Sequence, residues 1–196
     1  MSFILLGILN SQVTGAAGGA DGFDLIETQT LDSSTTSVTF NNNGAWDAYQ
    51  HLQIRTVLRS DRGDTSSRAS LRFNSDSTSS YQNHYLGTTG SALFSASNTP
   101  SYSNRIINID SVSATNQTSG SFGVALWEIT DHASTDKYKT IRFLDGQNGS
   151  FNRATLNSGA WRNTNALTSI TIADEYGDFI SGCRFSIYGY GKAVEE

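Results

Sequence analysis

This sequence contains very little proline, cysteine and charge. Of its 196 residues, one is Pro, one is Cys and 16% are charged, against roughly 25% charged residues in ordinary soluble proteins. The lone cysteine, Cys183, excludes an intramolecular disulfide, and its strand-like surroundings predict a small buried side chain. Neutral polar residues must therefore cover the surface, and together with 18 Gly they are typical of β-strands joined by tight turns.

Basic clusters and long apolar runs are also missing from the sequence. The net charge is −5, and no group of Lys and Arg is placed to follow a phosphate backbone, so we expect no nucleic acid partner. The apolar run 3–9 is far shorter than the roughly 20 residues that span a bilayer, and no basic region precedes it. We therefore expect neither a signal peptide nor insertion into a membrane.

The same apolar run predicts an extended N-terminal docking arm. Residues 15–20, Gly-Ala-Ala-Gly-Gly-Ala, are typical of a flexible linker, so the arm and linker occupy residues 1–22 and a single domain occupies residues 23–196. An exposed apolar heptapeptide favours aggregation unless a surface covers it. We expect a partner to cover its large side chains, which are Phe3, Ile4, Leu5, Leu6, Ile8 and Leu9. The alternative is that the arm folds back on its own domain as an extra strand.

From about residue 23 the sequence alternates between apolar and polar residues, with clusters of Asn, Asp, Ser and Gly between the alternating segments. The predicted strands are residues 23–31, 37–40, 52–59, 70–73, 84–86, 105–111, 122–129, 139–144, 167–172 and 183–188. No stretch favours a helix of useful length. Many short strands separated by turns predict an all-β fold, an antiparallel β-sandwich of the jelly-roll type.

Several turns and aromatic residues can be assigned in the same way. Asp145-Gly146 and Asn148-Gly149 tolerate a positive φ, so the strand 139–144 is expected to enter a loop or hairpin there. Residues 75–103 are predicted to form a long polar loop with aromatic anchors. At least two of the three tryptophans, at positions 46, 127 and 161, are expected in the core because Trp is mostly buried in sandwiches.

No catalytic or metal-binding pattern is found in the sequence. The histidines, His51, His84 and His132, lie about 30 to 50 residues apart without metal-ligand spacing, and no glycine-rich phosphate loop leads into a helix. Carboxylates for glycoside hydrolysis are available at Glu27, Glu128, Asp174, Glu175 and Asp178, but the last three belong to one segment that is predicted to be a solvated loop. We expect no enzyme, no cofactor and no bound metal.

A series of short patterns gives a resemblance to a known group of proteins. FDLIETQTL, SVTF, HLQIRTVLRS, LRFNSD and KYKTIRF, followed by the stretch 161–192, together resemble modules of virion proteins of tailed bacteriophages. The resemblance covers most of residues 23–192 and is most specific in the final stretch. It implies a structural role at the particle surface, as a capsid decoration or a part associated with the tail or tail fibre. It also implies contacts with other virion proteins and with copies of itself, as a homotrimer.

Two functions from different classes remain open. The first is a non-catalytic structural component of a virion, attached to a capsid or tail subunit through the arm. The second is a carbohydrate- or receptor-binding module in which Tyr81, Tyr85, Tyr102 and Trp161 stack on sugar rings of host-surface glycans. The arm favours the first function, because a free soluble lectin would not need it.

Overall fold

The computed structural model describes residues 22–97 and 103–192, and these form twelve strands. The strands are β1 (Asp24–Thr30), β2 (Ser37–Asn41), β3 (Tyr49–Leu58), β4 (Ser66–Phe73), β5 (Tyr81–Thr89), β6 (Ala92–Ser97), β7 (Ile106–Ser113), β8 (Gly123–Ile129), β9 (Lys139–Gln147), β10 (Arg153–Trp161), β11 (Ser169–Asp174) and β12 (Arg184–Lys192). This part of the chain includes no helix that is long and apolar enough to span a membrane.

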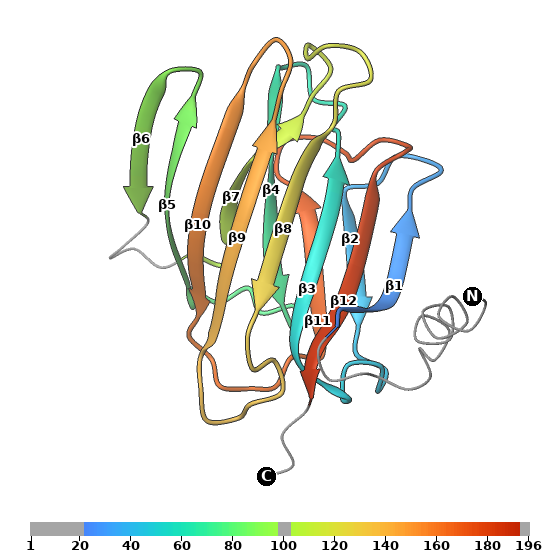
Figure 1. Ribbon diagram of the computed structural model, residues 1–196, viewed down its shortest axis with the longest axis vertical. Helices are drawn as coiled ribbons and strands as arrows, with labels where there is room; N and C mark the ends of the chain where they lie inside the picture. Colours follow the sequence, from blue (N-terminus) through green and yellow to red (C-terminus); the bar gives the residue numbers. More distant parts are fainter. Residues whose placement is uncertain (1–21, 98–102, 193–196) are drawn as a thin grey trace, which may run out of the picture.

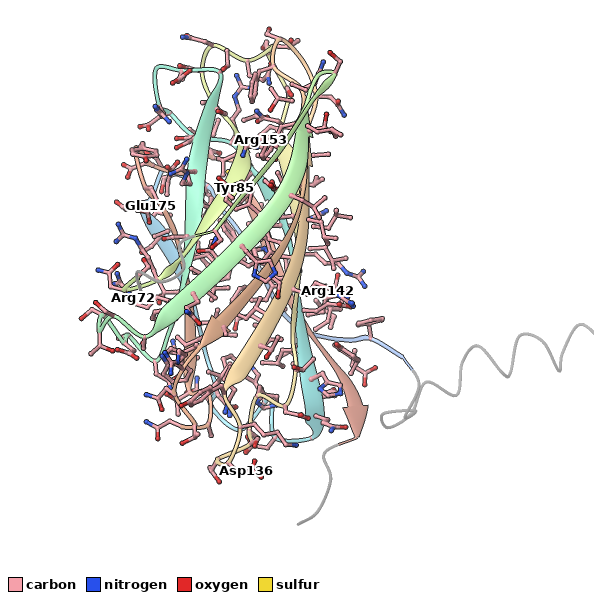
Figure 2. The ribbon with its side chains drawn as sticks, turned by 90° about the vertical axis from the view of Figure 1, so that its left-hand side faces the viewer. Arg72, Tyr85, Asp136, Arg142, Arg153 and Glu175 are labelled. Carbon is pink, nitrogen blue, oxygen red and sulfur yellow. The ribbon has the colours of Figure 1, made fainter. Side chains whose placement is uncertain are left out.

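The strands form two antiparallel sheets that face each other (Figure 1). The larger sheet has eight strands in the order β1-β12-β3-β8-β9-β10-β5-β6, and the smaller has four in the order β2-β11-β4-β7. Figure 2 shows the two layers edge-on, with Arg72 and Glu175 on the side of the smaller sheet and Arg142 on the side of the larger one. The chain is an all-β antiparallel sandwich, as the sequence predicts. The predicted arm, residues 1–22, lies outside the described residues except for Gly22.

Apolar side chains at alternate positions of the strands fill the space between the two sheets. In β8, Ala125, Trp127 and Ile129 are buried, and the residues between them are not. All three tryptophans and Cys183 are buried, which confirms both predictions. The rings of Trp127 and Phe143 stack with their centroids 5.0 Å apart. The core therefore lies mainly beneath the middle of the larger sheet, where β3, β8 and β9 are adjacent.

Toward β5 the interior becomes polar. The side chains of Asn83, Asp145, Thr155 and Asn157 are all buried there. The Thr155 hydroxyl donates to the Asp145 carboxylate, and the Asn157 amide donates to the same oxygen at 2.9 Å. Hydrogen bonds thus replace part of the apolar packing in this half of the sandwich, as the cost of burying polar groups requires.

Two sequence predictions about loops are wrong in part. The predicted loop 75–103 contains all of β5 and β6, of which only residues 84–86 are predicted as strand. Asp145 and Gly146 do not turn the chain, because both lie within β9 and pair with Thr155 and Ala154 of β10. The hairpin turns after Gln147, at the other predicted site, Asn148-Gly149, where Gly149 has a positive φ. Strands β6 and β10 were absent from the prediction.

One end of the sandwich is organised around a buried lysine. Lys139, the first residue of β9, is fully buried. Its ammonium group donates to the carbonyl oxygens of Ser134, Lys137 and Thr164 at 2.5, 3.1 and 3.2 Å. Three carbonyls and one cation satisfy each other, so the charge is buried without an orphaned donor.

Candidate functional site

The face of the larger sheet that points away from the smaller sheet is called here the outer face. It carries six aliphatic side chains that are largely exposed, and together they are called the aliphatic band. The band consists of Leu86, Leu93, Val124, Leu126, Leu144 and Leu156. Sheet faces exposed to water usually carry polar residues, so a band of this extent makes the outer face a candidate interaction surface.

Strand register places four of these leucines side by side. Leu86 is opposite Leu156, Leu156 is opposite Leu144, and Leu144 is opposite Leu126. These four residues cross four neighbouring strands, β5, β10, β9 and β8. Their relative exposures are 59, 45, 57 and 37%, in that order. Directly opposite residues on one face lie about 5 Å apart, so the leucines form a continuous apolar row.

A polar row runs beside the leucines, one pleat further along the strands. Across the same four strands, Ser158 is opposite both His84 and Arg142. Arg142 is in turn opposite Glu128. The Arg142 guanidinium donates to the Glu128 carboxylate, with Nε at 3.0 Å, and this hydrogen bond and charge raise the pKa of Arg142. An apolar row with a polar border resembles the arrangement of protein interfaces, which have an apolar centre and a polar rim.

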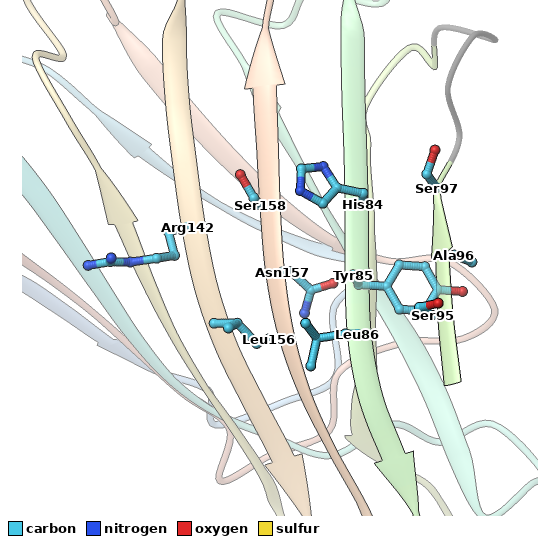
Figure 3. Close-up of a pocket in the computed structure, with 10 residues that line it drawn as sticks. All are labelled: His84, Tyr85, Leu86, Ser95, Ala96, Ser97, Arg142, Leu156, Asn157 and Ser158. Carbon is cyan, nitrogen blue, oxygen red and sulfur yellow. The ribbon is translucent and has the colours of Figure 1, made fainter. Parts of the chain in front are cut away.

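Where β6, β5, β10 and β9 meet, the outer face is hollowed into an open groove of about 530 Å³. Figure 3 shows Leu86, Leu156 and His84 at this groove, with Ser95 and Ser97 contributed by β6. The groove is thus one end of the aliphatic band together with the polar row beside it. Hydroxyl groups, an imidazole and aliphatic side chains meet there, a combination that suits a small polar ligand with one apolar side.

At the opposite edge of the outer face, aromatic rings surround an arginine. The Arg55 guanidinium lies 4.3 Å from the Tyr188 ring centroid and 5.3 Å from that of Phe23. Phe23 also packs on Tyr190, with centroids 4.8 Å apart. Arg55 is opposite Leu126 in the register of β3 and β8. The chain therefore enters the domain on the outer face, next to the aliphatic band.

Two of the four predicted glycan contacts are wrong. Tyr81 and Trp161 are fully buried, and both pack around Phe73 with centroids 6.4 and 5.6 Å from its ring. Neither ring can offer a face to a sugar. Tyr85 is half-buried between the layers, edge-on to Phe94 at 5.9 Å, and borders the groove. Tyr102 and the six arm residues lie outside the described residues.

The polar groups of these buried aromatics are also occupied. The Trp161 indole donates to the Asp76 carboxylate at 2.6 Å. Partial burial alone would raise the pKa of Asp76, but hydrogen bonds from Thr78, Trp161 and Ser80 outweigh it and lower that pKa to about 2. The Tyr81 hydroxyl donates to the Phe73 carbonyl at 3.2 Å, and burial raises its pKa. These contacts fix the turn before β5 and are structural.

The candidate carboxylates have separate partners. Glu128 pairs with Arg142 as described above, and Glu175 pairs with Arg105 at 2.7 Å. Asp178 accepts a hydrogen bond from the Thr36 hydroxyl at 2.8 Å. Asp174 is buried at the end of β11, where Ser67 donates to it at 2.5 Å, so its predicted place in a solvated loop is wrong.

Potential metal ligands are also dispersed in the part of the chain that the structure describes. No group of three or more His, Cys, Asp or Glu residues there is arranged to hold a metal ion. His51 lies beside Asp131, His84 lies at the groove, and His132 is buried. The outer face is therefore the feature that best qualifies as a functional site.

A signal for the aliphatic band exists in the sequence. In a strand with one wet face, apolar and polar residues alternate, whereas strands covered on both faces are apolar throughout. In the segment Gly123–Ile129, GVALWEI, the four successive residues from Val124 to Trp127 are apolar, and the first charged residue is Glu128. Such a run places apolar side chains on both faces of β8, the outer one included.

Comparison with known proteins gives no family. No protein-family model matches the chain, and no curated protein matches it in sequence. Among solved structures, exo-inulinase from Aspergillus awamori is 12% identical with a TM-score of 0.43, over 87% of this chain and 30% of that one. This chain thus spans less than a third of the inulinase.

Two further structures are smaller modules. The CBM40 of the Ruminococcus gnavus IT-sialidase, bound to α2,3-sialyllactose, is 11% identical with a TM-score of 0.35, over 87% of this chain and 95% of that one. The CBM2 module of the Dit protein of Lactobacillus casei BL23 phage J-1 is 8% identical with a TM-score of 0.17, over 95% and 86%. At these values, none of the three indicates an activity or a ligand for this chain.

Proposed function

We propose that this chain is a non-catalytic structural component of a phage virion, and that the aliphatic band is the surface through which its sandwich contacts another virion protein. The observation that carries this proposal is the row of four exposed leucines on neighbouring strands. The arm, residues 1–22, attaches the module to a capsid or tail subunit. Copies of the module surround a symmetry axis at the particle surface as a trimer.

The chemistry of the outer face supports a protein partner. Burying apolar area contributes roughly 25 cal/mol per Å², and an exposed leucine row therefore favours association with another apolar surface. The adjacent Arg142 and Glu128 give the contact a polar border whose charges favour one orientation of the partner. The assignment to a phage particle rests on the sequence resemblance across residues 23–192.

The test is incorporation of variants into particles. Replacing Leu126 and Leu144 by Asp places two charges in the centre of the band, and incorporation should fall at least tenfold. The matched control replaces Thr39 and Thr171 by Asp on the smaller sheet, where both side chains face outward, and should be incorporated normally. Normal incorporation of the band variant, with folding verified by circular dichroism, would refute a role of the band in assembly.

The groove supports a second candidate function, the binding of a host-surface glycan. Hydroxyl groups of Ser95, Ser97 and Ser158 and the His84 imidazole lie around an aliphatic floor, and such groups can hydrogen-bond sugar hydroxyls. Calorimetry with host-surface polysaccharide should then show millimolar or tighter binding that the substitution H84A weakens at least fivefold. A lack of heat change at millimolar sugar would remove this candidate.

A further inference from the structure

The apolar side chains of the outer face would be exposed to water in the free protein, before it joins any particle. Six aliphatic side chains are exposed together there, and the same chain carries the uncharged segment 3–9, Phe-Ile-Leu-Leu-Gly-Ile-Leu. Each of these apolar surfaces favours aggregation when it faces water. We propose that, in the unassembled protein, the segment 3–9 binds the aliphatic band of its own chain.

The place where the chain enters the domain supports this proposal. Phe23 stands one residue before β1, and its ring lies over Arg55 and against Tyr190 on the outer face. Leu25, which follows in β1, is opposite Tyr188 and is exposed. The chain therefore arrives on the same face that carries the aliphatic band, and its path to the band does not cross a sheet edge.

The length of the connecting segment is sufficient for this contact. Residues 10–22 can span about 40 Å when extended, at about 3.3 Å per residue. Strand β9, at the middle of the leucine row, is four strand spacings from β1 in the sheet order, or roughly 19 Å at about 4.8 Å per spacing. The connecting segment is therefore long enough to reach the whole band.

Tethering makes the chain's own segment a stronger competitor than a separate molecule. A short flexible linker gives an effective concentration in the millimolar range, far above the micromolar concentrations of a typical assay. The segment has no charge and no proline, so its contact with the leucines carries no cost of charge burial. Its binding would shield both apolar surfaces until a partner displaces it. This inference goes beyond the proposed function, since it concerns the free protein.

Crosslinking of the full chain tests the location of the segment. The substitutions L5C and L144C pair the middle of the segment with the middle of the band, and the native Cys183 is buried and unavailable to mild oxidants. The matched control pairs L5C with T39C, because Thr39 is exposed on the smaller sheet. Thr39 also lies close to β1, since Gln29 donates to its carbonyl at 3.2 Å, so Thr39 is within the span of the linker as well.

The expected result is an intramolecular disulfide that forms at least tenfold faster in L5C/L144C than in L5C/T39C, measured by mass spectrometry of peptides. Equal rates for the two pairs would overturn the proposal. A disulfide between two chains would overturn it too, because the occupant of the band would then be the segment of a second copy.

A second measurement does not depend on which residue of the segment contacts which leucine. Binding of the dye ANS should be weak in the native full chain and should rise several-fold in L5D/L6D, where the segment no longer covers the band. The control V13D, outside the apolar run, should behave like the native chain. Adding L126D and L144D to L5D/L6D should remove the rise.

If native protein already binds ANS as strongly as L5D/L6D, the band is open and the proposal fails. This failure leaves the proposed function intact, because incorporation of the band variant into particles is measured separately. Conversely, normal incorporation of L126D/L144D together with a rapid L5C/L144C disulfide would refute the particle contact and keep the intramolecular one.

Discussion

The two outward faces of the sandwich differ sharply in chemistry. On the smaller sheet, the central row consists of Thr39, Thr171 and Arg72, and the two threonine hydroxyls hydrogen-bond at 2.9 Å. On the larger sheet, the corresponding row consists of leucines. Both faces occupy equivalent positions in the pleat, so the fold itself does not require leucine there. The difference supports the proposal that the larger sheet, and not the smaller one, is the face that contacts a partner.

The largest expected loss of stability comes from a substitution in the core between the two sheets. Strand β8 carries Leu126 on the outer face and the buried Trp127 next to it. The substitution W127A should lower the free energy of unfolding by about 3 to 5 kcal/mol, since it leaves a large cavity. Urea denaturation followed by circular dichroism measures the loss. A loss below about 1 kcal/mol would mean that the interior does not hold the two sheets together.

Removal of the buried ammonium group should have a somewhat smaller effect. In K139M, the carbonyls of Ser134, Lys137 and Thr164 lose their donor, and buried groups without partners cost about 1 to 3 kcal/mol. Hydrogen exchange should become faster in the loop before β9 than in β2 of the smaller sheet. Uniform acceleration over both sheets would indicate a global rather than local role.

A pH-dependent effect should come from His132, which connects the ends of both sheets. Its Nε2 atom lies 2.9 Å from the carbonyl oxygen of Tyr49 in β3, and its own carbonyl accepts from the Leu167 amide before β11. Burial lowers the pKa of His132 below 6.5, so the folded chain keeps it neutral. The stability is complete above pH 6.5 and is lost as the pH falls below that value.

The loss amounts to at most about 1.4 kcal/mol per pH unit for one proton. Denaturation at pH 7.5 and 5.5 should therefore show a lower free energy of unfolding at the acidic value, and the variant H132Q should show a flatter dependence. The range stays above the region where carboxylates such as Asp76 titrate. An equal slope in native protein and variant would assign the acid sensitivity to another group.

The smallest expected effect decides the comparison between the faces. The substitution L126S replaces an exposed leucine, and surface substitutions usually change the free energy of unfolding by less than about 0.5 kcal/mol. Thermal denaturation should place L126S close to the native protein, in contrast to W127A on the same strand. A loss of several kcal/mol would show that the leucine row stabilises the isolated fold and is not reserved for a contact.

The sequence predicts the strands whose inner residues are apolar, and it fails where the interior is polar. Segment 52–59 alternates clearly, and Leu52, Ile54 and Leu58 are buried in β3. Strand β10 was missed because its inward residues, Thr155 and Asn157, belong to the buried hydrogen-bonded cluster. Propensity alone disfavours Asn157 and Gly159 in a strand, and only the sheet register shows that the hydrogen-bonding partners of Thr155 and Asn157 are buried beside them.

Edge strands and functional sites are hard to predict from the sequence for a different reason. Residues 92–97, ALFSAS, form the outermost strand β6 and are mostly exposed, so no core imposes a pattern on them. Tyr81 and Trp161 are candidate glycan contacts in the sequence because polar residues surround them there, whereas Phe73 packs against both rings in the fold. The apolar run of β8 is one signal for the aliphatic band, but the extent of the band depends on the register between distant segments, which no single segment reveals.

The carbonyl cage around Lys139 has a consequence for the medium in which the protein works. Rings of backbone oxygens are sites where a free cation often binds, and such an ion leaves when a chelator or a dilute solution removes it. Here the positive charge is covalently part of the chain. The loop geometry at this end of the sandwich should therefore be the same in dilute and in concentrated salt, and indifferent to chelators.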